Sequence, residues 1–267
     1  MKKAVMTIHG FLTVTEDFGR LYDYLDSYDE VKAVEIPGHN GEKPDFSAFT
    51  PEATFAAVLD AYDELKSRND SVDVVGFSMG GALATWLASV RPVNRLALIS
   101  PANKYLNAAL PFSAGKFASD LSKTVFHATE GKLKDKLDAT NKAFAPYVEN
   151  LRATGKVAKE RTLRYMNPRT YSAFSKIVKS SNVVLETVSP NNTPTLILWG
   201  KLDELVPYKS VKYLTGHFPK AQVKIYPDVG HAMLYTNLDD VIIRDVVEFL
   251  TEGKVSPDVP KRSMSEN

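Results

Sequence analysis

Short apolar runs rich in β-branched residues recur along the chain, and segments long enough for helices separate them. The runs cover 4–8, 31–36, 72–77, 96–99, 195–199 and 222–226, bounded by Gly, Pro, Asn or Asp. The intervening helix candidates include 51–67, 80–90 and 237–250. Strands that are joined through helices run parallel, and the connecting helices cover both faces of the sheet. The pattern therefore predicts an α/β protein with a doubly wound, mostly parallel sheet of about six or more strands.

The alternation of strands and helices fails in the middle third of the chain. Residues 103–190 look largely helical, and the first strand-like run to interrupt them is 182–185. We therefore expect an inserted, mainly helical domain at 103–190, which divides the core into 1–102 and 191–252. Residues 253–267 are mostly polar and contain two prolines, so we expect a flexible tail there.

The expected insertion is also basic. Residues 103–180 hold 15 Lys or Arg and 6 Asp or Glu, which gives this segment a net charge of +9 and the remainder −8. Helices with solvated basic faces would explain this charge, and so would attraction of an anionic substrate or surface. The whole chain has a net charge of only +1, which argues against a nucleic-acid-binding protein.

Composition and the ends of the chain limit the class of protein further. Hydrophobic residues make up 44% and charged residues 24%, as in ordinary soluble globular proteins. The absence of cysteine excludes disulfides, thiolate nucleophiles and cysteine-ligated zinc. The apolar run after Lys3 is too short for a secretory signal, and no stretch approaches the roughly 18 apolar residues of a membrane span. We therefore expect a cytoplasmic protein without an integral membrane segment.

The motif that indicates chemistry lies between a predicted strand and a predicted helix. Gly76-Phe77-Ser78-Met79-Gly80 follows the run 72–77 and matches the pattern G-x-S-x-G. A serine in such a tight turn lies at a helix N-terminus, where free N–H groups and the helix dipole favour the oxyanion of acyl transfer. The alternative is a glycine-rich turn that only packs closely. We interpret Ser78 as a nucleophile.

A serine hydroxyl needs a general base, and the base needs an acid that orients it. His231 lies in a loop between the strand run 222–226 and the last helix, which makes it the candidate base. Asp203 follows the strand run 195–199 and is the candidate acid. Glu204 is adjacent to Asp203, and Asp228 lies three residues before His231, so both stay open as alternatives.

The first strand ends in a turn that can donate a backbone N–H group. The turn reads Ile8-His9-Gly10-Phe11-Leu12. We expect the N–H of Phe11 to pair with the N–H of Met79 as an oxyanion hole. The other histidines are interpreted as structural, surface or packing residues: His9, His39, His127 and His217.

The order Ser78, Asp203, His231, with the elbow at 76–80 and the His-Gly-Phe turn, resembles the α/β-hydrolase superfamily. The likeness is greatest to its small bacterial carboxylesterases and monoacylglycerol-lipase-like members, and it includes a Pro-Gly-His segment at 37–39. Two departures are the start of the chain almost at the first parallel strand, and Asn40 where a glycine is common. The resemblance implies the α/β-hydrolase fold and a cap domain at 103–190 that covers the active site.

The resemblance also implies hydrolysis through an acyl-enzyme with no cofactor and no metal. We expect a carboxylesterase or lipase-like enzyme that cleaves small-molecule esters of short to medium acyl chains. Thioester, amide, peptide or carbon–carbon bonds remain alternatives on the same triad, and so does a binding protein that uses its triad little. Ser78 excludes the aspartate nucleophile of haloalkane dehalogenases.

Overall fold

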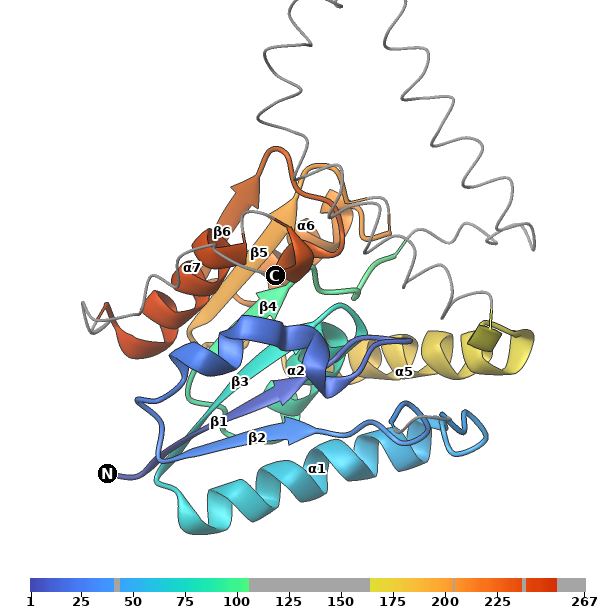
Figure 1. Cartoon of the computed structure of the whole chain (residues 1–267), viewed down its shortest axis with the longest axis horizontal. Coiled ribbons are helices and arrows are strands. Elements are labelled where there is room, and N and C mark those ends of the chain that lie inside the picture. The colour runs from blue at the N-terminus through green and yellow to red at the C-terminus, as the bar shows by residue number, and fades with distance from the viewer. Residues whose placement is uncertain (41–43, 106–163, 204, 237–238, 254–267) are drawn as a thin grey trace, which may run out of the picture.

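Six parallel strands form the centre of the computed structural model (Figure 1), which describes residues 1–40, 44–105, 164–203, 205–236 and 239–253. They are β1 (Lys3–Ile8), β2 (Glu30–Val34), β3 (Ser71–Phe77), β4 (Leu96–Ile99), β5 (Thr195–Gly200) and β6 (Ala221–Tyr226). Their order in the sheet is β2-β1-β3-β4-β5-β6, and every neighbouring pair is parallel. The predicted doubly wound parallel sheet is confirmed.

The central strands β1, β3, β4 and β5 read as largely apolar runs because both of their faces are buried. In β3, Val72 and Val74 belong to the core cluster on one face of the sheet, while Val75 and Phe77 belong to the cluster on the other face. Successive side chains of a strand point to opposite faces, so a strand covered on both sides has few positions for polar residues.

Helices cover both faces of the sheet (Figure 1). Residues of α1 (Pro51–Arg68), α2 (Met79–Val90), α5 (Pro168–Thr187) and α6 (Tyr208–His217) are buried in the cluster on one face. Residues of the 3-10 helices η1 (Thr15–Tyr24) and η2 (Met233–Tyr235) and of α7 (Asp239–Thr251) are buried in the cluster on the other face. Of the helices described, none is long and apolar enough to cross a bilayer.

The last part of the expected insertion is a helix that packs on the core. Helix α5 begins at Pro168 after the N-cap Asn167 and lies against α2 and α1. The interpretation of 182–185 as a strand-like run is wrong, because these residues form the end of α5, where Leu185 is buried and Val183 is 54% exposed. Residues 106–163 and the expected tail from 254 lie outside the described residues, so the division into core and cap stays a prediction.

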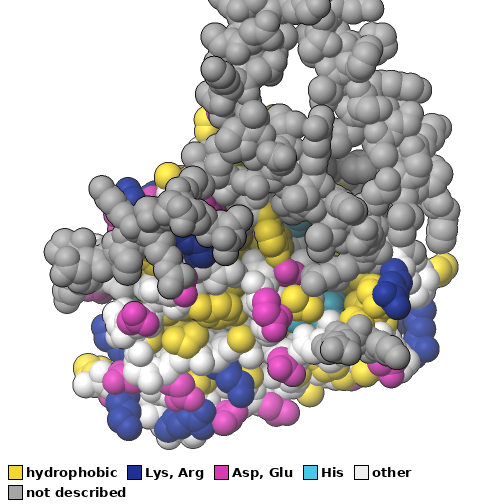
Figure 2. Space-filling view, viewed as in Figure 1, with side chains coloured by type: hydrophobic (Ala, Val, Ile, Leu, Met, Phe, Trp, Pro, Cys, Tyr) yellow, Lys and Arg dark blue, Asp and Glu magenta, His cyan; other side chains and the backbone are white. Residues whose placement is uncertain are grey.

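Charges of both signs are interspersed on the face of the molecule in Figure 2. Arg91 pairs with Asp63 at 2.7 Å, and Arg68 pairs with both Glu30 and Glu64. Exposed pairs of this kind contribute little to stability. Most of the basic residues counted in the expected insertion lie within 106–163, outside the described residues.

The chain changes its direction across the sheet between β1 and β3, since β2 lies on one side of β1 and β3 on the other. In open α/β sheets, ligands bind in the crevice outside the carboxyl ends of the strands at such a point. Gly10 follows β1 and Ser78 follows β3, and a Cβ atom added at Gly10 would lie 3.0 Å from the Ser78 Cβ. The topology therefore brings the His-Gly-Phe turn against the serine.

Candidate active site

Ser78 occupies a strained turn between β3 and α2. Its φ of 53° and ψ of −116° lie in a region that residues with a side chain rarely adopt. Its amide donates to the carbonyl of Ile99 at 3.0 Å, and its carbonyl accepts from the amides of Gly81 at 3.0 Å and Ala102 at 2.9 Å. These bonds hold a backbone conformation that costs of order 1–3 kcal/mol, as is common at functional sites.

Both glycines of the motif are required by close backbone approach. A Cβ atom at Gly80 would lie 1.9 Å from the carbonyl oxygen of Ile8, and one at Gly76 would lie 2.5 Å from the carbonyl oxygen of Gly80. Any side chain at these positions would push α2 away from the end of β1. The glycines therefore set the distance between the serine turn and the first strand.

The imidazole of His231 lies between the hydroxyl of Ser78 and the carboxylate of Asp203. Its Nε2 is 2.9 Å from the serine Oγ, and its Nδ1 is 3.0 Å from Oδ2 of Asp203. Because a carboxylate accepts hydrogen bonds, we assign the ring proton to Nδ1, which leaves Nε2 to accept from the serine hydroxyl. The ring of Phe77, which the sequence analysis did not single out, lies 5.3 Å from the imidazole between centroids. Three side chains from three loops thus form one hydrogen-bonded row.

Asp203 is held by the turn that follows β5. Its side chain is fully buried, and Oδ1 accepts from the amides of Leu205 at 3.0 Å and Val206 at 2.8 Å. These two donors were not predicted from the sequence, although an aspartate that bonds an amide two residues further on is a known turn signature. Of the two alternative acids, Asp228 is exposed and Glu204 lies outside the described residues.

The two predicted oxyanion donors flank Ser78. Met79 is the first residue of α2, so its N–H has no acceptor within the helix. Phe11 directly follows Gly10, and the described residues provide no hydrogen-bond acceptor for the amide of either Phe11 or Met79. The turn around Phe11 includes Leu12 at a φ of 59°. An amide without an acceptor among the described residues is what an oxyanion donor requires, and both predicted donors meet this condition.

Comparison with known proteins shows which family the chain belongs to. The family model described as alpha/beta hydrolase fold matches residues 3–238. The chain belongs to the α/β-hydrolase family. The carboxylesterase of Bacillus subtilis (strain 168) is 24% identical to this hydrolase over 253 residues, which cover 93% of this chain and 92% of the relative. The pimeloyl-[acyl-carrier protein] methyl ester esterase of Salmonella typhimurium is 25% identical over 234 residues, with 85% and 86% covered.

The fold is also that of solved lipolytic enzymes. A structure from the metagenome-derived lipolytic enzymes LipS and LipT matches with a TM-score of 0.64 at 18% identity, covering 94% of each chain. At this identity the match speaks for the fold alone. Family and relatives together place the hydrolase in the esterase and lipase type, and they support an enzyme.

His9 has a structural role in the hydrolase, as predicted. Its side chain is buried, its Nε2 accepts from the amide of Ile36 at 3.3 Å, and its Nδ1 donates to the carbonyl of Gly10 at 3.0 Å. The ring thus ties the end of β1 to the segment after β2. His217 packs on a tyrosine ring 4.5 Å away, as expected for a packing residue, and His127 lies outside the described residues.

An aromatic wall begins at the predicted oxyanion turn. The ring of Phe11 stacks on Phe49 at 5.6 Å and on Phe174 of α5 at 5.0 Å between centroids. His39 is buried against Phe46 and Phe49 at 4.7 Å from each, so its predicted packing role is confirmed. Phe174 was not predicted from the sequence as part of the site, although it lies on the buried stripe of α5.

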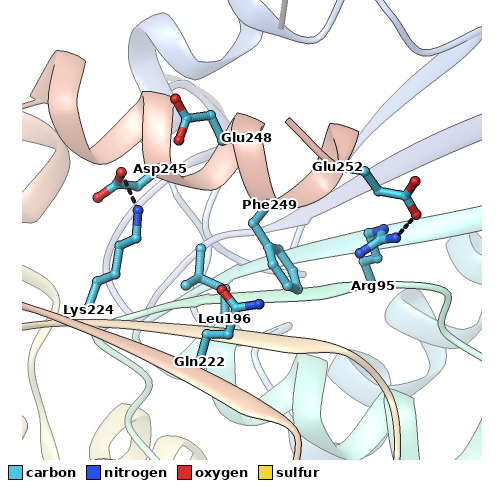
Figure 3. A pocket seen from close by; sticks show the side chains of 8 residues that line it. All are labelled: Arg95, Leu196, Gln222, Lys224, Asp245, Glu248, Phe249 and Glu252. Atoms are coloured by element: carbon cyan, nitrogen blue, oxygen red, sulfur yellow. Dashed lines mark hydrogen bonds and ion pairs between the residues drawn. The ribbon is translucent and has the colours of Figure 1, made fainter. Parts of the chain in front are cut away.

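A cleft of the hydrolase lies at the opposite end of the sheet, where strands begin (Figure 3). Lys224 pairs with Asp245 at 2.5 Å, and Arg95 pairs with Glu252 and lies over the ring of Phe249. The two cations of this cleft thus pair with two of its three carboxylates, and the candidate catalytic residues all lie at the other end, after the carboxyl ends of strands. Within the described residues, no group of three or more His, Cys, Asp or Glu side chains could hold a metal ion.

Proposed function

We propose that this α/β-hydrolase cleaves carboxylic esters of short to medium acyl chains through an acyl-enzyme. Ser78 is the nucleophile, His231 the general base, and Asp203 the acid that orients the imidazole. The observation that supports this most is the row of hydrogen bonds from the serine Oγ through the imidazole to a buried carboxylate, at 2.9 and 3.0 Å. The esterase relatives support an ester as the bond that is cleaved.

In the acylation step, the hydroxyl of Ser78 gives its proton to Nε2 of His231 while Oγ attacks the ester carbonyl carbon. The imidazolium that forms is stabilised by Asp203, whose carboxylate is kept in place by hydrogen bonds from two backbone amides. The tetrahedral intermediate then collapses, and the proton on Nε2 passes to the leaving alcohol. Water attacks the acyl-enzyme in the same way, and the carboxylic acid is released.

The negative charge that develops on the carbonyl oxygen is taken up by the amides of Phe11 and Met79. Both donors belong to backbone that is fixed before substrate binds, so no reorganisation is needed in the transition state. Met79 also begins α2, and the positive end of the helix dipole favours an anion there. Removal of one such donor costs about 10²–10³ in rate in a serine protease.

The aromatic wall formed by Phe11, Phe49 and Phe174 gives the acyl group an apolar surface beside the serine. Apolar pockets with a few fixed polar groups are typical of small-molecule sites. Thioesters, amides and carbon–carbon bonds are cleaved by the same kind of triad, so compounds with these bonds are alternative substrates that have to be compared with the ester.

The test uses chromogenic esters and thioesters of increasing acyl length, together with a fluorophosphonate probe that labels active serines. We expect a burst of the alcohol product equal to the enzyme concentration, labelling of Ser78, and loss of both in Ser78→Ala with unchanged circular dichroism. Equal labelling of the alanine variant would remove Ser78 from this role. Absence of turnover on the whole panel would favour a binding protein.

A further inference from the structure

One carboxylate connects the turn that contains Phe11 with the loop that contains His231. Asp17 lies in η1, and its Oδ2 accepts from the amide of Val14 at 2.8 Å. Its Oδ1 accepts from the hydroxyl of Tyr235, a residue 218 positions further along the chain. This hydrogen bond, which we call the Asp17–Tyr235 clasp, joins η1, which follows the turn of Phe11, to η2, which follows His231.

On the oxyanion side, the clasp continues a short series of local bonds. The hydroxyl of Thr13 donates to the carbonyl of Gly10 at 2.9 Å, and the amide of Asp17 donates to the carbonyl of Val14 at 3.1 Å. Leu12, with a left-handed φ that a side chain disfavours, lies within the turn that the first of these bonds closes. A turn that contains such a residue keeps its conformation only where the surrounding bonds determine it.

On the histidine side, Tyr235 ends a tight turn that begins next to His231. The amide of Met233 donates to the carbonyl of His231 at 2.9 Å, and the amide of Tyr235 donates to the carbonyl of Ala232 at 3.1 Å. This turn is η2. A displacement of the Tyr235 hydroxyl would therefore shift the backbone of His231, which lies only four residues earlier in the chain.

Apolar packing alone does not fix how these two segments are aligned. Phe18 and Leu21 of η1 are buried in the same cluster as Met233 and Leu234. Apolar contact is non-directional, so it holds the segments together without setting their relative position. A hydrogen bond between a hydroxyl and a carboxylate depends on both distance and angle, and it can set that position.

We propose that Asp17 and Tyr235 are positioning residues, whose bond keeps the Phe11 amide and the His231 imidazole at the spacing that the transition state requires. This inference rests on the proposed function. The oxyanion donor and the base act on the same tetrahedral intermediate, and neither clasp residue touches the reacting atoms. Loss of the clasp therefore lowers kcat and leaves KM unchanged, because the interaction matters in the transition state and not in substrate binding.

The first variant is Tyr235→Phe, which removes only the hydroxyl of a side chain that is 38% exposed. Its matched control is Tyr24→Phe, which removes a hydroxyl that donates to Asp240 at 3.3 Å and likewise joins η1 to the C-terminal part of the chain. We expect kcat on a short chromogenic ester to fall about 3- to 10-fold in Tyr235→Phe, which corresponds to the net contribution of one hydrogen bond. KM and Tm should be the same as in the control. The control keeps the parent kcat.

The second variant is Asp17→Asn, which keeps an oxygen for the Val14 amide but weakens the bond to the tyrosine. If the fall in kcat results from loss of the clasp, the double variant with Asp17→Asn and Tyr235→Phe should lose no more activity than Tyr235→Phe alone. Additive losses, or a Tyr235→Phe variant as active as Tyr24→Phe, overturn the clasp while the triad stands. If turnover is retained in Ser78→Ala, both the proposed function and the clasp are overturned.

Discussion

Replacement of Asp203 by asparagine tests the proposed triad at its most buried member. In the parent, Oδ1 accepts from two backbone amides at 3.0 and 2.8 Å, and Nδ1 of His231 lies 3.0 Å from Oδ2 and 3.1 Å from Oδ1. An asparagine can satisfy both amides only with its carbonyl oxygen in the Oδ1 position. Its NH₂ group then takes the place of Oδ2 and points a donor at Nδ1.

This arrangement favours the other tautomer of the imidazole. Where Nδ1 accepts from this NH₂ group, the ring proton moves to Nε2, which then faces the hydroxyl of Ser78 as a donor. The ring cannot accept the serine proton in this tautomer, and no carboxylate stabilises the imidazolium. The equivalent change in chymotrypsin-like proteases lowers kcat by about 10⁴, which is about 5.5 kcal/mol of transition-state stabilisation. We expect a loss of that order in Asp203→Asn.

The assay is kcat on a short chromogenic ester, with Tm as a check on folding. Asp228→Asn serves as a matched control, because Asp228 is exposed and lies on the loop of His231. Glu204→Gln tests the adjacent alternative. A kcat for Asp203→Asn within about tenfold of the parent, or a larger loss in Glu204→Gln, would refute the assignment of the acid.

Three further predictions concern the core and the insertion. Gly80→Ala should unfold the protein or lower its urea midpoint strongly, because the added Cβ would lie 1.9 Å from the carbonyl oxygen of Ile8; an unchanged midpoint contradicts the tight approach of α2. Burial raises the pKa of the Asp73 carboxyl above its ordinary value of 3.8. The contribution of this carboxyl to stability is therefore complete below about pH 4, where it is protonated, and is lost as pH rises through the folded-state pKa. Above about pH 4 the unfolding free energy of Asp73→Asn should thus depend less on pH than that of the parent; equal pH dependence would contradict this. Replacing 106–163 by a short linker should leave a soluble core that cleaves a small activated ester without acyl-length preference, and retention of the parent's full acyl-length profile would show that this segment is not a substrate-binding cap.

The sheet and the position of Ser78 were predictable from sequence because both depend on short-range patterns. A strand that is buried on both faces has to be largely apolar, as 72–77 is apart from Asp73. A serine that stands between such a strand and a helix, with a glycine two residues away on each side, is typical of a nucleophile elbow. The loop positions of Asp203 and His231 follow from the same alternation of strands and helices.

Other features depend on contacts that sequence spacing does not record. The β-branched run at 182–185 favours a strand locally, but tertiary packing makes it the end of α5, with Leu185 buried against the core. The ring of Phe174 meets Phe11 through the tertiary packing of α5, which lies against α2. The amides that hold Asp203 and the hydroxyl of Tyr235 depend on turn geometry and on a separation of 218 residues.

Stability and catalytic rate should therefore respond to different parts of the molecule. The apolar strands and the two helical layers account for most of the buried surface, which dominates the free energy of folding. The proposed catalytic groups all lie on the loops after β1, β3, β5 and β6, and two of these loops contain the left-handed residues Leu12 and Ser78. Only specific bonds keep such loops in place, so losing one bond can lower kcat while Tm hardly changes. The clasp variants differ from core variants in this way: a core substitution lowers Tm first, whereas Tyr235→Phe should lower kcat at constant Tm.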